Sequence, residues 1–164
     1  MARLVPFLAV MLAVAPTAIA QSKAIGRYND WRVYTEGEGR NMVCFAAVEA
    51  SDMAPKAADH GEVTFYVSAF KSGAATSQPS LRVGYTLRAD LAPAAIVGRD
   101  RFPMYAAGQE AFFPDDREKP LIEALKKGQE LRVEAASVKD ARTAYHFSLK
   151  GSRDAIDKAK ALCK

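Results

Sequence analysis

Thiol chemistry in this chain can come only from two cysteines, Cys44 and Cys163. No Cys-x-x-Cys motif is present, and no pair of histidines accompanies them. A reactive thiol and a metal site are the alternatives to a disulfide, but neither has a supporting motif. In an exported chain two cysteines most simply form one disulfide, and we predict that Cys44 and Cys163 are bonded.

The beginning of the chain indicates export. A short basic start, Met1-Ala-Arg3, precedes an almost wholly apolar run over residues 4–15, and small residues lead to Ala20. This is the layout of a secretory signal peptide, and the apolar run is short for a membrane span. We predict a signal peptide over residues 1–20, with a retained N-terminal anchor as the alternative. The mature chain, residues 21–164, is predicted to be one domain without a transmembrane segment.

Histidine and carboxylate side chains gather in one polar stretch. His60 stands near Asp52, Asp59 and Glu62, which could form a hard-metal or acid–base cluster. The carboxylates are irregularly spaced and only one histidine is present, so a solvated loop is the favoured interpretation. His146 is interpreted as a packed or surface histidine. No metal site and no cofactor are predicted.

Nucleophilic catalysis has one candidate pair. Ser148 and His146 lie two residues apart in an apparent strand and therefore share a face. No Gly-x-Ser-x-Gly motif surrounds the serine, and neither a Gly-x-Gly-x-x-Gly motif nor a phosphate loop is present. We predict no catalytic residue and a protein that is not an enzyme.

Lys150 and Gly151 form the one candidate ligand site. They open the last predicted helix, where backbone amides and a lysine side chain together suit an anion. The alternative is that the turn from strand to helix needs a glycine for its geometry alone.

The elements that must position these residues are mostly short strands. Alternating apolar and polar residues predict eight or nine of them, and turn signals recur every eight to twelve residues. The predicted strands are 31–35, 41–48, 62–70, 81–87, 94–97, 102–105, 110–113, 130–137 and 145–151. The predicted helices are 121–128 and 152–163. This pattern is typical of a mainly β, antiparallel sandwich or barrel.

The charge distribution and the aromatic residues both bear on which partners the chain could bind. The formal net charge is +4, and the basic residues are scattered rather than clustered, so nucleic acid is not an expected partner. Five aromatic residues could form a recognition surface, although a place in the core is the favoured interpretation for most of them. They are Trp31, Tyr34, Tyr66, Tyr85 and Tyr105.

Four short motifs occur in an order seen in a known family. They are Trp31-Arg-Val-Tyr, Cys44-Phe-Ala-Ala, the helix from Leu121 to Gly128, and Ser148-Leu-Lys-Gly followed by a helix ending in Cys163. In these motifs the chain resembles the invasion-associated locus B family, which are exported proteins of Gram-negative and chiefly alphaproteobacterial cells. The resemblance implies an immunoglobulin-like β-sandwich, a periplasmic location with possible outer-membrane association, and no established enzymatic activity.

The leading hypothesis is a non-catalytic periplasmic protein that binds or supports an envelope protein or surface component. A small-ligand or anion-binding module is the second hypothesis, and Lys150 and Gly151 are its candidate residues. A host-directed surface factor is the third.

Overall fold

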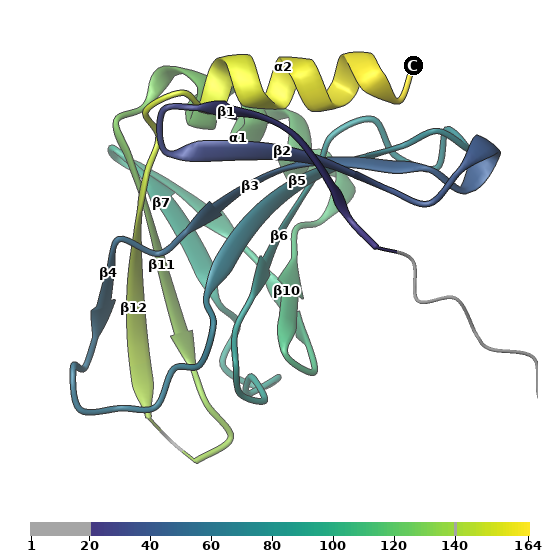
Figure 1. The fold of residues 1–164 in the computed structure, drawn as a ribbon. Helices are drawn as coiled ribbons and strands as arrows, with labels where there is room; N and C mark the ends of the chain where they lie inside the picture. Colours follow the sequence, from purple (N-terminus) through teal and green to yellow (C-terminus); the bar gives the residue numbers. More distant parts are fainter. Residues whose placement is uncertain (1–20, 140) are drawn as a thin grey trace, which may run out of the picture.

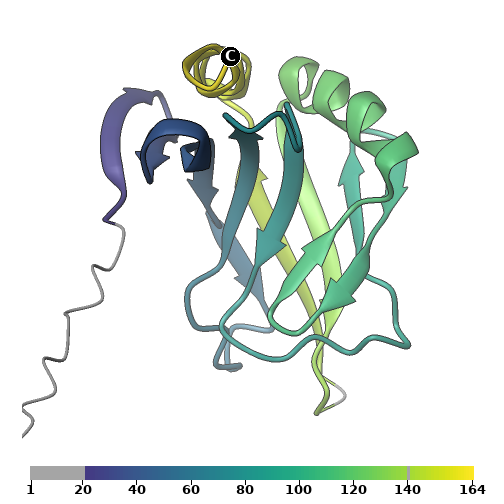
Figure 2. The ribbon, with the colours of Figure 1, turned by 90° about the vertical axis from the view of Figure 1, so that its right-hand side faces the viewer.

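The computed structural model describes residues 21–139 and 141–164 (Figure 1). The signal peptide predicted for residues 1–20 lies outside the described residues. Within the described ranges, two antiparallel sheets face each other, and two α-helices lie near one end of the sandwich (Figures 1 and 2). The prediction of a mainly β, antiparallel sandwich with an internal and a C-terminal helix is confirmed.

The strand order defines the two layers. In the described part of the chain the larger sheet has seven strands, in the order β1-β2-β3-β5-β6-β10-β9. They are β1 (Lys23–Tyr28), β2 (Trp31–Glu36), β3 (Val43–Glu49), β5 (Thr64–Phe70), β6 (Gln78–Arg82), β10 (Glu110–Phe112) and β9 (Tyr105–Ala107). The smaller sheet consists of β4 (Asp52–Ala54), β12 (Arg142–Ser148), β11 (Glu130–Ala136), β7 (Ala94–Val97) and β8 (Asp100–Pro103), in that order. The helices are η1, a 3₁₀ turn (Gly39–Asn41), α1 (Asp115–Lys127) and α2 (Ser152–Leu162).

The core forms because successive side chains of a strand point to opposite faces. One set of alternating apolar residues from each sheet therefore meets in the middle of the sandwich and is fully buried. The largest of these side chains are Trp31, Phe65, Leu81, Leu131, Tyr145 and Phe147. Trp31 also ties the layers together, because its indole Nε1 donates a hydrogen bond of 2.9 Å to the carbonyl oxygen of Ser148 on the opposite sheet.

The internal helix is longer than predicted. It begins at Asp115 rather than Leu121 and includes Pro120, which lacks the N–H that an interior helical residue donates. Acidic residues in its first turn offset this loss because they interact favourably with the positive end of the helix dipole. Neither α1 nor α2, the two α-helices of the described residues, is long and apolar enough to cross a membrane.

Two strands lie outside the predicted ones. The residues before Trp31 form β1, which pairs with β2 through a tight turn at Asn29, a residue with φ of +53°. Asparagine tolerates this left-handed conformation, and such turns join antiparallel strands closely. The other strand is β4, which lies in the polar stretch before His60 and pairs with β12.

The strand predicted over residues 81–87 ends early, at Arg82. Gly84 lies against Gly61 so closely that a Cβ on either residue would lie 2.6–2.7 Å from the other glycine's Cα. The chain crosses a neighbouring loop there instead of continuing in the sheet.

The C-terminal helix closes one end of the inner face of the larger sheet. Ala155, Ile156 and Ala159 are among its buried residues, and it contacts β1, β2, β3 and β5. The predicted disulfide is confirmed: the sulfur atoms of Cys44 and Cys163 are 2.09 Å apart, and 119 positions separate the two residues. The bond fixes the end of α2 to β3, the third strand along the chain.

Candidate functional site

The His60 side chain is buried, whereas the acidic residues around it are exposed, as the interpretation of this stretch as a solvated loop predicts. His60 is only 6% exposed; its Nδ1 lies 3.1 Å from the Tyr145 hydroxyl and its Nε2 lies 2.9 Å from the Pro55 carbonyl oxygen. The nearby carboxylates bond elsewhere: Asp52 pairs with Lys56, and Asp59 and Glu62 accept hydrogen bonds from the Gly61 N–H and the Thr64 hydroxyl, respectively. Across the described residues, no three histidine, cysteine or acidic side chains are grouped so that they could hold a metal ion.

The hydrogen bonds around His60 form a continuous chain. The Pro55 carbonyl only accepts, so Nε2 donates to it, and Nδ1 is hydrogen-bonded to the Tyr145 hydroxyl. The Tyr145 hydroxyl is also hydrogen-bonded to the Tyr85 hydroxyl at 2.7 Å, and the Tyr85 hydroxyl to that of Thr143 at 2.7 Å. Burial raises the pKa of the Tyr145 phenol far above its usual range. The chain links the loop before β5 to the last strand, and we assign it a structural role.

Removing the central hydroxyl of this chain should destabilise the fold. In Tyr145→Phe, Nδ1 of His60 and the Tyr85 hydroxyl each lose a hydrogen-bond partner. We expect the free energy of unfolding to fall by about 1–3 kcal/mol, measured by urea denaturation. Tyr105→Phe is the control because Tyr105 is 52% exposed. Equal effects of the two substitutions would contradict the structural role.

The candidate catalytic pair is not assembled. His146 Nδ1 lies 3.0 Å from a carboxylate oxygen of Glu130, and the Ser148 hydroxyl donates to the carboxylate of Asp30 at 2.6 Å. The serine and the histidine therefore bond to separate carboxylates rather than to each other.

Lys150 and Gly151 lie where the last strand passes into α2, as predicted. Gly151 has φ of +91°, and a Cβ there would lie 1.9 Å from the carbonyl oxygen of Tyr28. The backbone of Lys150 is engaged as well, because its N–H donates to Ser148 and its carbonyl accepts from Asp30. Close packing against the β1–β2 turn thus accounts for the glycine. Anion binding at these two residues stays a prediction.

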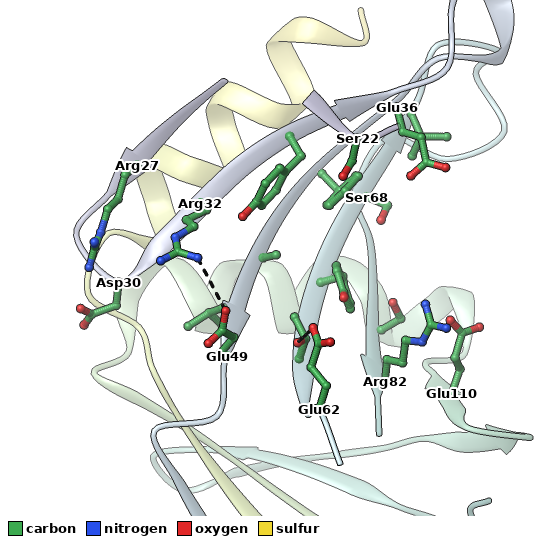
Figure 3. Close-up of a pocket in the computed structure, with 18 of the residues that line it drawn as sticks. Ser22, Arg27, Asp30, Arg32, Glu36, Glu49, Glu62, Ser68, Arg82 and Glu110 are labelled. Atoms are coloured by element: carbon green, nitrogen blue, oxygen red, sulfur yellow. Dashed lines mark hydrogen bonds and ion pairs between the residues drawn. The ribbon is translucent and has the colours of Figure 1, made fainter. Parts of the chain in front are cut away.

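A trough lies on the outer face of the larger sheet. It has a volume of about 810 Å³ and is lined mainly by outward-facing residues of β2, β3, β5, β6 and β10 (Figure 3). The opposite face of this sheet carries the core residues and is covered by the smaller sheet and by α2. The trough therefore belongs to the one face of this sheet that the described chain leaves uncovered.

Three half-buried aromatic rings cross the floor of the trough. Tyr34 on β2 and Phe45 on β3 are directly opposite in the sheet register, and their ring centroids are 5.3 Å apart with nearly parallel planes. The Phe45 ring meets Tyr66 on β5 edge to face at 5.8 Å. We call these three residues the aromatic strip.

Charged side chains stand at the ends of the trough. At one end Arg32 pairs with Glu49 at 3.6 Å (Figure 3). At the other end stand Glu62, Arg82 and Glu110, and within the described residues none of these three forms an ion pair at 4.0 Å or less. The pKa of the Tyr66 phenol is raised, chiefly by burial and further by the negative charges of Glu62 and Glu110. We call Glu62, Arg82 and Glu110 the charged end.

The placement of most aromatic residues in the core was correct only in part. Trp31 is fully buried and Tyr85 packs against the core, whereas Tyr34 and Tyr66 line the trough and Tyr105 is exposed. The alternation of side chains along a strand predicts the outward orientation of Tyr34. With Trp31 facing inward, Tyr34 three positions later on the same strand must face outward.

The fold and the trough define the class of this protein: an antiparallel β-sandwich, closed by a disulfide-linked C-terminal helix, with one open concave sheet face. No family model matches the chain, and no curated protein matches it. Among solved structures, the crystal structure of invasion associated protein B from Bartonella henselae is similar, with a TM-score of 0.58 and 14% sequence identity. The match covers 87% of this chain and 98% of that chain, and it shows a shared fold.

Proposed function

We propose that this chain is an exported, non-catalytic protein of the Gram-negative periplasm that binds an envelope component in the trough. The observation that carries the proposal is the aromatic strip, which lies on an uncovered, concave sheet face beside the charged end. Half-buried rings that remain partly open to water on such a face are typical of a recognition surface. A ligand that covers the rings would remove this apolar surface from water, and the charged groups offer it hydrogen-bond and ionic partners.

The proposed location rests on the disulfide and on the predicted signal peptide. A signal peptide over residues 1–20 would direct the chain out of the cytoplasm, and a disulfide persists in oxidising compartments such as the periplasm. The resemblance of the sequence motifs to an exported family implies the same location, and the fold shared with invasion associated protein B agrees with that resemblance. Outer-membrane association is part of the same proposal.

The absence of catalysis is also part of the proposal. Cys44 and Cys163 are bonded to each other, His60 is enclosed in a buried hydrogen-bond chain, and His146 pairs with Glu130. These contacts occupy the side chains that would otherwise be the first choice for a nucleophile or a general base.

Envelope binding can be tested by co-sedimentation. The protein, purified from cells that export it, is mixed with isolated envelopes of the bacterium that encodes it. We expect Phe45→Ala/Tyr66→Ala to bind at least about tenfold more weakly than wild type, because buried aromatic anchors dominate binding energies. Tyr105→Ala, on the same sheet but outside the trough, is the control and should bind as wild type does.

The double variant must remain folded for this comparison, which thermal unfolding verifies. Glu110→Gln serves as a second variant because it removes a charge at nearly constant volume. Equal binding by all forms of the protein would overturn the trough as the binding surface, and so would a loss of binding confined to Tyr105→Ala.

A further inference from the structure

We infer that the trough takes a short oligosaccharide containing amino sugars, either free or N-acetylated. This inference rests on the proposed function and names the class of ligand for the same surface. It follows from the polar groups of the floor, from the charges at one end, and from the size of the trough.

The floor combines aromatic rings with hydroxyl groups. Ser68 on β5 lies directly opposite Phe45, Ser80 on β6 lies directly opposite Tyr66, and both serines line the trough. The strand backbones are paired within the sheet, so the floor offers a ligand only side-chain groups. An extended peptide adds to the edge of a sheet, where backbone groups are free, rather than to its face.

A partner helix would fit this floor poorly. Its apolar face would cover the serine hydroxyls without offering them hydrogen bonds, and a buried polar group left unpaired costs about 1–3 kcal/mol. A sugar ring has C–H groups that pack on aromatic side chains and hydroxyls around its rim. It can cover the rings and satisfy the serines at the same time.

The charged end selects among sugars. Glu62 and Glu110 only accept hydrogen bonds when ionised, and Arg82 only donates. Sugar hydroxyls, amines and N-acetyl amides supply donors to the two carboxylates. Because two carboxylates face one guanidinium, a uronic acid or a phosphorylated sugar would be repelled at this end, whereas an ammonium group would be attracted.

The dimensions fit a few sugar rings rather than a protein partner. The volume of about 810 Å³ lies within the range of about 300–1,000 Å³ that is usual for small-molecule sites. A second hollow of about 340 Å³ extends the charged end and shares Glu62, Tyr66 and Arg82 with the trough. A terminal sugar in this hollow would meet both carboxylate and guanidinium groups, with an aromatic ring beside them.

Four tetrasaccharides test the inference by isothermal titration calorimetry. They are tetra-N-acetylchitotetraose, its fully deacetylated form, cellotetraose and tetragalacturonate, at concentrations up to about 10 mM, which detect dissociation constants near 1 mM. We expect one or both chitin-type tetramers to bind, cellotetraose to bind more weakly, and tetragalacturonate not to bind. Tyr66→Ala and Glu110→Gln should each weaken binding by about tenfold, whereas Tyr105→Ala should have no effect.

Several results would overturn the inference. They are no binding of either chitin-type tetramer, tighter binding of cellotetraose or tetragalacturonate, and binding that Tyr66→Ala and Glu110→Gln leave unchanged. Failure of the proposed function is separable from these results. If the trough variants lose envelope binding while no chitin-type tetramer binds, the trough remains the binding surface and its ligand is not an amino sugar.

Discussion

Replacing Cys44 and Cys163 together with alanine is expected to lower the free energy of unfolding by about 3–5 kcal/mol. The two residues are 119 positions apart, so the bond closes most of the described chain into one loop and removes many conformations from the unfolded state. The two cysteines also pack with Met42, Ala69 and Leu162 in a small apolar cluster of their own. Urea denaturation of the oxidised wild type and of the double variant measures the difference.

Reduction provides the matched control. Wild type unfolded in the presence of a reductant should approach the stability of the double variant, and the double variant should not respond to the reductant. A decrease of less than about 1 kcal/mol would mean that residual structure in the unfolded chain already keeps the ends together. That result would contradict the stabilising role assigned to the bond.

Gly151→Ala is expected to destabilise the protein by about 3–4 kcal/mol, through backbone strain and a steric clash together. The residue has φ of +91°, and its added Cβ would meet the Tyr28 carbonyl oxygen at 1.9 Å. The turn between β1 and β2 would have to move away from the start of α2. The hydrogen bond from Asp30 to Lys150, which joins these two segments, would be weakened.

The substitution Gly73→Ala introduces the backbone strain of a positive φ without the steric clash that is expected for Gly151→Ala. Gly73 has φ of +85°, close to that of Gly151, but no described atom outside its chain neighbours lies within 4 Å of the position that an added Cβ would take. Its substitution should cost only the conformational penalty, about 1 kcal/mol. Similar losses for the two variants, measured by thermal and urea unfolding, would show that the contact with Tyr28 is not tight in solution.

The fold could be predicted from local patterns because its strands alternate clearly. Val63, Phe65, Val67 and Ala69 alternate along the strand predicted over residues 62–70 and therefore share one side, and all four are buried. The disulfide was predicted because the chain has two cysteines and an expected export signal. Two predictions were wrong where tertiary contacts override the local pattern. The internal helix α1 includes Pro120 and is longer than predicted. The strand predicted over residues 81–87 ends at Arg82 because Gly84 meets Gly61 beyond it.

The trough was harder to predict than the fold. Alternation shows that Tyr34 and Tyr66 face away from the core, but it does not show that they lie near each other. That depends on strand order and register, which place Phe45 between them. The curvature of a sheet likewise arises from its accumulated twist, which no short segment specifies. The buried role of His60 was missed because its partner Tyr145 is 85 positions away.

The trough on the outer face of the larger sheet is the proposed binding surface for an envelope component. Site-specific photocrosslinking in intact cells tests this proposal, with a photoreactive phenylalanine derivative in place of Ser68, inside the trough, or of Tyr105, on the same face but outside the trough lining. We expect position 68 to crosslink to envelope material and position 105 not to. Crosslinks from position 105 and none from position 68 would contradict the proposal.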